Sequence, residues 1–232
     1  MFNQRFILIN LAVFLFIFIG CGSDSSPTKE ERPLKQNIKN THNNTLKECI
    51  NLPKIDTGDS YTVRIKDLKS KQTITVETSI VDINATELTY EITLSGDISG
   101  MQRSVDSISI HDDFIDTLKV NTTDMFTNSK STHVYSPYLR NLYNKACVGM
   151  VWTNNYNVNM LTTPIKYTST VEAINESKHI ALGTYSTVKI KVENEDGSTD
   201  IIWEDVNEAK TVLSEKYDSS GNLVETQELI SE

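Results

Sequence analysis

Apolar and polar residues alternate along four segments of the chain: 61–66, 73–83, 87–94 and 186–194. In segment 87–94, Leu88, Tyr90 and Ile92 alternate with Thr89 and Glu91. A period of two residues is typical of β-strands that bury one face and leave the other in water. Weaker alternation of the same kind predicts further strands at 104–111, 114–120, 150–161, 165–174, 179–185, 199–204, 210–217 and 223–230.

The connections between these segments are typical of hairpins. An Asp-Gly pair in 194–198 and a glycine in 218–222 favour tight turns. Only segment 135–147 predicts a helix, because Ser136 suits an N-cap and Pro137 a first helical position. Apolar residues then follow at helical spacing: Leu139, Leu142, Tyr143 and Ala146.

The number of predicted strands limits how the sheet can bury its apolar face. About ten to twelve strands are too many for one flat open sheet. Almost no helix is available to cover the apolar face, so the sheet has to curl around it or split into two layers. We predict an all-β, mainly antiparallel domain over 49–232. It is a strongly curved half-barrel or near-closed barrel of about 10–12 strands, with at most one or two short helices, in preference to a sandwich.

The N-terminal residues are typical of an exported protein. The apolar stretch 6–19, broken only by Asn10, is shorter than the roughly 20 residues that a membrane-spanning helix needs. Its length and the preceding Arg5 fit a signal peptide over 1–20. Phe18-Ile19-Gly20-Cys21 resembles the lipobox of bacterial lipoproteins, which implies cleavage before Cys21 and a lipid anchor on that cysteine. An ordinary cleaved signal is the alternative.

Residues 21–48 are mostly Ser, Asn, Lys, Glu, Thr and Pro, a composition that predicts a flexible tether. The chain has three cysteines, an odd number for an exported protein. Lipidation of Cys21 would leave Cys49 and Cys147, and we predict that these two form a disulfide, with two buried free thiols as the alternative. Gly22 in place of Asp after the anchor favours the outer membrane, if the cell has two membranes.

Charge and motifs exclude several classes of function. The net charge of −9 at pH 7 makes the chain repel phosphate backbones, so we expect no nucleic-acid partner. The four histidines have no metal-ligand spacing, and the acidic segment 111–116 is typical of a solvated turn. No phosphate-binding loop, nucleophile elbow or dinucleotide-binding motif occurs. We therefore expect no enzyme, no metal site and no cofactor.

Two C-terminal stretches resemble a known group of envelope proteins. They are VYSPYL…ACVGMVW in 134–152 and ALGTYSTVKIKV…TDIIWED…TVLSEKYDSSGNLVETQEL in 181–229. Their strand spacing is similar to that of bacterial lipoprotein domains related to the LolA/LolB-like half-barrel. Ser-Pro-Tyr stands where related domains often carry Pro-Pro. The resemblance implies a curved sheet and carries no catalytic signature.

Trp152 and Trp203 are the candidate ligand-binding residues, because aromatic side chains inside a curved sheet can line an apolar pocket. Ordinary core packing is the alternative role for both. We expect a membrane-anchored, non-enzymatic envelope lipoprotein whose sheet binds an apolar ligand, such as a lipid or acyl chain, or an envelope protein partner. A structural surface lipoprotein without a small-molecule site and a membrane-tethered hydrolase are the alternatives.

Overall fold

A computed structural model describes residues 48–158 and 164–232. The chain divides into two units, Met1–Thr45 and Leu46–Glu232, and every described residue belongs to the second. The predicted signal peptide over 1–20, the lipidation site Cys21 and all but the last residue of the predicted tether over 21–48 lie outside the described residues.

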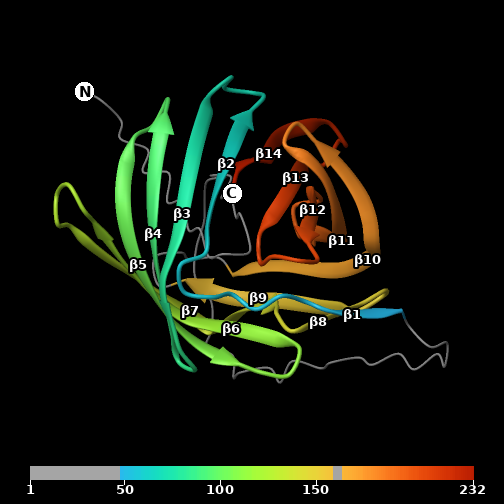
Figure 1. The fold of residues 1–232 in the computed structure, drawn as a ribbon, viewed down its shortest axis with the longest axis horizontal. Coiled ribbons are helices and arrows are strands. Elements are labelled where there is room, and N and C mark those ends of the chain that lie inside the picture. The colour runs from blue at the N-terminus through green and yellow to red at the C-terminus, as the bar shows by residue number, and fades with distance from the viewer. Residues whose placement is uncertain (1–47, 159–163) are drawn as a thin grey trace, which may run out of the picture. The chain divides into compact units, whose positions relative to one another are not determined.

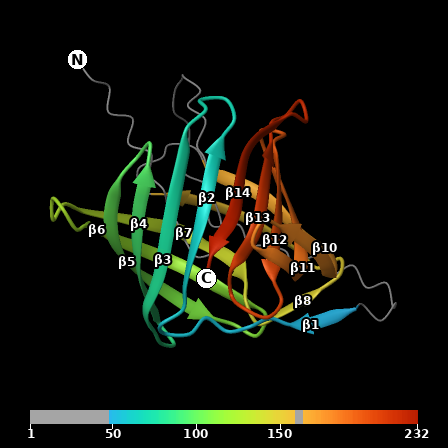
Figure 2. The same cartoon turned by 45° about the horizontal axis from the view of Figure 1, so that its top comes forward.

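The described residues form strands and no helices, and twelve of the strands close into one antiparallel barrel (Figures 1 and 2). In chain order the barrel strands are β2 (Ser60–Asp67), β3 (Thr73–Ile83), β4 (Glu87–Gly96), β5 (Gly100–Ile110), β6 (Phe114–Asp124), β7 (Lys130–Leu142), β9 (Val151–Val158), β10 (Ile165–Ile180), β11 (Gly183–Asn194), β12 (Thr199–Asp205), β13 (Thr211–Tyr217) and β14 (Leu223–Ser231). Each pairs with its neighbours in this order, and β14 pairs with β2 to close the ring. The prediction of a near-closed antiparallel barrel is confirmed.

The apolar positions of the alternating segments meet on the inner face of this barrel. Val63 of β2 lies opposite Val76 of β3 and Leu229 of β14, and Val76 lies opposite Leu94 of β4. All four side chains are buried. Closure gives every strand one face that is shielded from water, which is why the period of two is so regular in β2 and β4.

The predicted helix over 135–147 is wrong. Residues 130–142 form β7, and the residues after it form β8 (Lys145–Cys147). The apolar residues at helical spacing are all buried, but they come from the end of one strand, a turn and a second strand. Backbone groups of the turn bond to other strands or loops: Tyr143 N–H donates to Asp113 and the Asn144 carbonyl accepts from Leu52.

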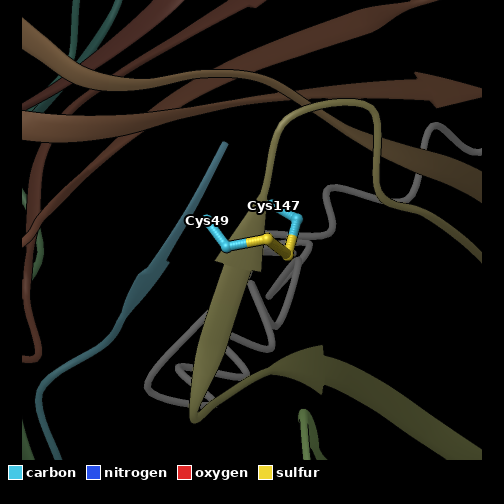
Figure 3. Close-up of a disulfide and its surroundings, with 2 residues drawn as sticks. All are labelled: Cys49 and Cys147. Carbon is cyan, nitrogen blue, oxygen red and sulfur yellow. A yellow bond between two sulfur atoms is a disulfide. The ribbon is translucent and has the colours of Figure 1, made fainter. Parts of the chain in front are cut away.

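The remaining two strands form a small separate sheet that carries the disulfide. β1 (Cys49–Asn51) pairs only with β8, and Cys49 lies directly opposite Cys147. Their sulfur atoms are bonded, as Figure 3 shows. The predicted Cys49–Cys147 disulfide is confirmed. It ties the residues before the barrel to the connection between β7 and β9.

Candidate ligand-binding site in the barrel interior

Trp152 lies on the interior face of β9. Its register partner on β10 is Ser169, which in turn lies opposite Val192 of β11, and all three side chains are buried. The indole ring lies 5.9 Å from the ring of Phe114. Its Nε1–H has no hydrogen-bond partner among the described residues. Trp152 thus brings both apolar surface and an unused donor into the interior.

Trp203 lies on the opposite face of the barrel wall. Its neighbours Ile202 and Glu204 pair with Ile190 and Val188, which face inward, whereas Trp203 pairs with the outward-facing Lys189. It is nevertheless only 5% exposed, because side chains of β10 cover it. The prediction that both tryptophans line one interior is therefore wrong for Trp203.

The cover over Trp203 is polar. Its Nε1–H donates to Glu176 Oε1 at 2.9 Å, and the Lys178 ammonium lies 3.4 Å from the ring centroid. An ammonium so close to the face of an indole forms a cation–π contact. These two interactions use both the donor and one face of the ring, so Trp203 stabilises the wall and does not contribute to the interior site.

Besides Tyr61 of β2, four tyrosines from four strands are buried on the interior face. They are Tyr90 of β4, Tyr135 of β7, Tyr156 of β9 and Tyr167 of β10. The ring centroids of Tyr135 and Tyr156 are 5.3 Å apart, and those of Tyr156 and Tyr167 are 6.4 Å apart, both edge to face. Burial raises the pKa of all four hydroxyls, so each is neutral and can donate a hydrogen bond.

Asp106 of β5 is the carboxyl group that belongs to this cluster. Its side chain is on the interior face beside Tyr90, and the residue is only 1% exposed. Burial raises its pKa to about 8, and a hydrogen bond with Tyr90 partly opposes that rise. The charge of Asp106 in turn contributes to the raised pKa of Tyr90 and Tyr135. We call Asp106 and the four tyrosines the tyrosine–Asp106 cluster.

Several polar atoms in and around this cluster have no hydrogen-bond partner among the described residues. They are Asp106 Oδ1, His133 Nε2, Tyr156 OH, Tyr167 OH and Ser169 Oγ, in addition to the Trp152 indole nitrogen. Leaving such a buried group unsatisfied costs about 1–3 kcal/mol. Native proteins contain only a few such groups, and a bound molecule or ordered water commonly accounts for them. Among the described residues nine buried side-chain atoms have no partner, and six of them lie on this stretch of interior wall, which makes it the candidate site. The other three are Thr78 Oγ1, Glu204 Oε2 and Gln227 Oε1.

A second group of interior side chains carries charge on β12, β13 and β14. Asp200, Lys216 and Glu225 are successive register partners, and Lys216 lowers the pKa of both carboxyls, against the larger effect of burial. Burial raises the pKa of Glu225 to about 7. Glu204 is buried farther along β12, and burial raises its pKa to about 7 as well. The interior therefore carries an excess of acidic groups.

The acidic segment 111–116 contributes one buried carboxylate, Asp116, to the barrel wall. His111 and Asp112 are exposed in the turn after β5, but the Asp116 carboxylate is buried and accepts two hydrogen bonds of 2.7 Å from Arg140. His111 Nε2 lies 3.0 Å from the same carboxylate. The reading of this segment as a solvated turn is thus wrong for Asp116. In residues 48–158 and 164–232, no group of three or more His, Cys, Asp or Glu side chains could hold a metal ion.

The raised pKa of Asp106 predicts a stability that depends on pH. A carboxyl whose pKa is higher in the folded state stabilises the fold at low pH and loses that contribution as pH rises through the folded pKa. Asp106→Asn should therefore gain stability relative to wild type between about pH 4 and pH 8, by roughly 1 kcal/mol per pH unit. Urea unfolding at a series of pH values measures the difference.

The matched control is Asp82→Asn, which changes an exposed carboxyl on β3. Its unfolding free energy should stay within about 0.5 kcal/mol of wild type over the same range. Parallel stability curves for wild type and Asp106→Asn would show that Asp106 is ionised in the folded protein and would contradict the prediction.

The sequence contained one indication of this site, which is missed when the segments are examined only for alternation. In segment 104–111 the inward positions begin with Ser104 and Asp106, two polar residues where an apolar pair would be expected. A carboxyl at an inward position of a strand points to a specific interior role. Tyr156 and Tyr167 come from strands that are adjacent in space, and only the barrel topology brings them to Tyr135.

The fold and the site together define a closed antiparallel barrel with a partly polar interior. The chain matches no family model, no curated protein and no solved structure with which it was compared. The resemblance to LolA/LolB-like lipoprotein domains therefore stays a prediction. In the part of the chain that the structure describes, no helix is both long and apolar enough to cross a membrane.

Proposed function

We propose that the protein is a non-enzymatic lipoprotein of the cell envelope, tethered through Cys21, whose barrel holds a small ligand in its interior. The observation that supports binding is the set of unpartnered polar atoms on the interior face, led by Asp106 Oδ1, Tyr156 OH and Tyr167 OH. A ligand with one polar end and an apolar remainder suits this wall, because the cluster adjoins apolar side chains such as Leu88 and Ile92.

The location in the envelope is supported by sequence and by the disulfide. The Phe18-Ile19-Gly20-Cys21 pattern predicts a lipid anchor, and a disulfide between Cys49 and Cys147 suits an oxidising compartment. Two or more acyl chains on Cys21 would give stable anchoring. The outer membrane is the favoured site if the cell has two membranes.

Replacing Cys21 with serine tests the anchor. The variant should leave the membrane fraction or remain as an unprocessed precursor, because serine cannot take the thioether-linked lipid. Fractionation followed by mass spectrometry of the N-terminus measures both outcomes. Cys49→Ser is the control, since this substitution removes the disulfide but leaves the lipid anchor on Cys21. A Cys21→Ser protein that is processed normally and stays in the membrane fraction would contradict this part of the proposal.

Native mass spectrometry of the protein purified from its own cells tests the bound ligand. Ordered water is the other way to satisfy buried polar groups, and water would leave no mass beyond that of the lipidated protein. We expect an additional non-covalent mass. Ser169→Leu should remove it, because the serine lies on the interior face between Trp152 and Val192.

Thr170→Leu is the matched control for that variant. Thr170 is the next residue on β10, and its register partner Val151 is exposed, so the new side chain lies on the outer face. It should leave the bound mass unchanged. A bare protein mass in wild type, or loss of the bound mass in both variants alike, would contradict an interior binding site.

A further inference from the structure

The interior wall has an acidic character that restricts which ligands it can hold. The register places Asp106, Asp200, Glu204 and Glu225 on the inner face. Lys216 is also there, but it lies between Asp200 and Glu225 and interacts with both. Among the described residues, the register partners of Asp106 are the apolar Leu88 and Val120, so no cation there would offset its charge. An anionic head group could therefore lie beside Asp106 only while that carboxyl keeps its proton.

The same wall offers two features that attract a cation. Asp106 Oδ1 is buried and has no partner among the described residues, so it can accept a charge-assisted contact. Tyr135, Tyr156 and Tyr167 form a continuous group of rings on the same face. Tyrosine ring faces attract ammonium groups, and the attraction is strongest where water is excluded.

We propose that the interior site selects ligands with an organic ammonium head group, which Asp106 pairs with and the tyrosine rings enclose. This inference rests on the proposed function, since it assigns the ligand class of that interior site. Apolar side chains of the same inner face would contact the rest of the ligand. Leu88 of β4 is the register partner of Asp106, and Ile92 of β4 and Ile108 of β5 are further buried apolar residues.

Ammonium binding should be coupled to the ionisation of Asp106. Tyr90 of β4 and Tyr135 of β7 interact with Asp106, and its register partner Val120 of β6 lies opposite His133 of β7. Tyr156 and Tyr167 join this group through ring contacts that begin at Tyr135, and the charge of Asp200 on β12 acts on Tyr167. Burial keeps the tyrosines neutral and lowers the pKa of His133, which favours its uncharged form, so Asp106 is the group of this set expected to change charge near neutral pH. A permanent cation then binds the ionised Asp106, and one proton is released.

The experiment compares three ligands of one chain length on the full-length protein: hexyltrimethylammonium, hexanol and hexanoate. Isothermal titration calorimetry at pH 7 in two buffers with different ionisation enthalpies gives both the affinity and the number of protons released. We expect hexyltrimethylammonium to bind at least about tenfold more tightly than hexanoate, with release of close to one proton. Its affinity should rise about tenfold per unit from pH 6 to about pH 8.

Two variants connect the result to Asp106. Asp106→Asn should lose about tenfold or more in ammonium affinity and its pH dependence, while hexanol affinity stays within about threefold. Retained hexanol binding shows that the variant is folded, and the exposed Asp82→Asn should behave as wild type. If Asp106→Asn fails to fold, proton release by wild type still decides the question.

The outcomes separate this inference from the proposed function. Binding of hexanol or hexanoate as tight as that of the ammonium compound, without proton release, would overturn the ammonium assignment and leave interior binding intact. If none of the three ligands binds and the native protein carries no additional mass, both the ligand class and the interior site are wrong.

Discussion

Replacing Arg140 with alanine is expected to lower the free energy of unfolding by about 3–5 kcal/mol, because it leaves the buried Asp116 carboxylate with only the half-exposed His111 imidazole beside it. Arg140 Nε and Nη2 donate to the two oxygens of Asp116 at 2.7 Å each, and the Asp116 side chain is 3% exposed. The guanidinium also lies 4.8 Å from the centroid of the Tyr138 ring and 5.2 Å from that of Phe114. Chemical unfolding followed by tyrosine and tryptophan fluorescence measures the loss.

Arg103→Ala is the matched control for this prediction. Arg103 Nη1 lies 3.5 Å from Glu91 Oε1 on the outer surface, where 46% of the arginine side chain is exposed. Exposed ion pairs of this kind contribute about 0–1 kcal/mol. Arg140→Lys should recover only part of the stability, because a single ammonium cannot donate two parallel hydrogen bonds. Equal losses for Arg140→Ala and Arg103→Ala would show that the buried pair is not the stabilising feature.

Alternation predicted the architecture well where a strand is uniform. Segments 61–66 and 87–94 correspond closely to β2 and β4, because in a closed barrel one face of each strand is buried along its whole length. The count of about ten to twelve strands followed from the same pattern. Closure itself depends on the pairing of β14 with β2, and no local pattern in either segment reveals that partner.

β-Bulges explain the main errors in the predicted strand boundaries. The sequence predicted two strands at 165–174 and 179–185, whereas β10 runs without a break from Ile165 to Ile180. Register shifts against β11 occur between Val171 and Ala173 and between Ala173 and Glu176, and Asn175 has a positive φ of 54°. An extra residue in one strand moves the following side chains to the other face, so continuous strands lose their alternation at such points.

The false helix over 135–147 has a related cause. Thr117 lies opposite Leu139 and Lys119 opposite Val134, so residues 135–138 of β7 face a single residue of β6. The extra residues interrupt the alternation of apolar and polar side chains at the position where Ser136 and Pro137 suit the start of a helix. The site was hidden for a different reason, since the tyrosine–Asp106 cluster draws one residue from each of five strands and no short segment contains it.

Removal of the disulfide is expected to destabilise the fold by about 4–5 kcal/mol. The bond links Cys49 and Cys147 across a sequence separation of 98 residues, a loop that contains β2 to β7. Cross-linking so long a loop greatly reduces the conformational freedom of the unfolded chain. Chemical unfolding of the Cys49→Ala, Cys147→Ala double variant measures the effect, and wild type unfolded with a reducing agent present should lose a similar amount.

The native state should change locally as well, because β1 has three residues and pairs only with β8. A two-stranded sheet of this length is marginal in water without a covalent link. Hydrogen exchange in the double variant should therefore become fast at Leu52 N–H and Val148 N–H, which donate across this sheet. The amide of Val63 in β2 should remain protected, since the barrel strands pair independently of the disulfide. Unchanged exchange at Leu52 and Val148, together with a stability loss below about 1 kcal/mol, would show that packing and not the bond holds β1 in place.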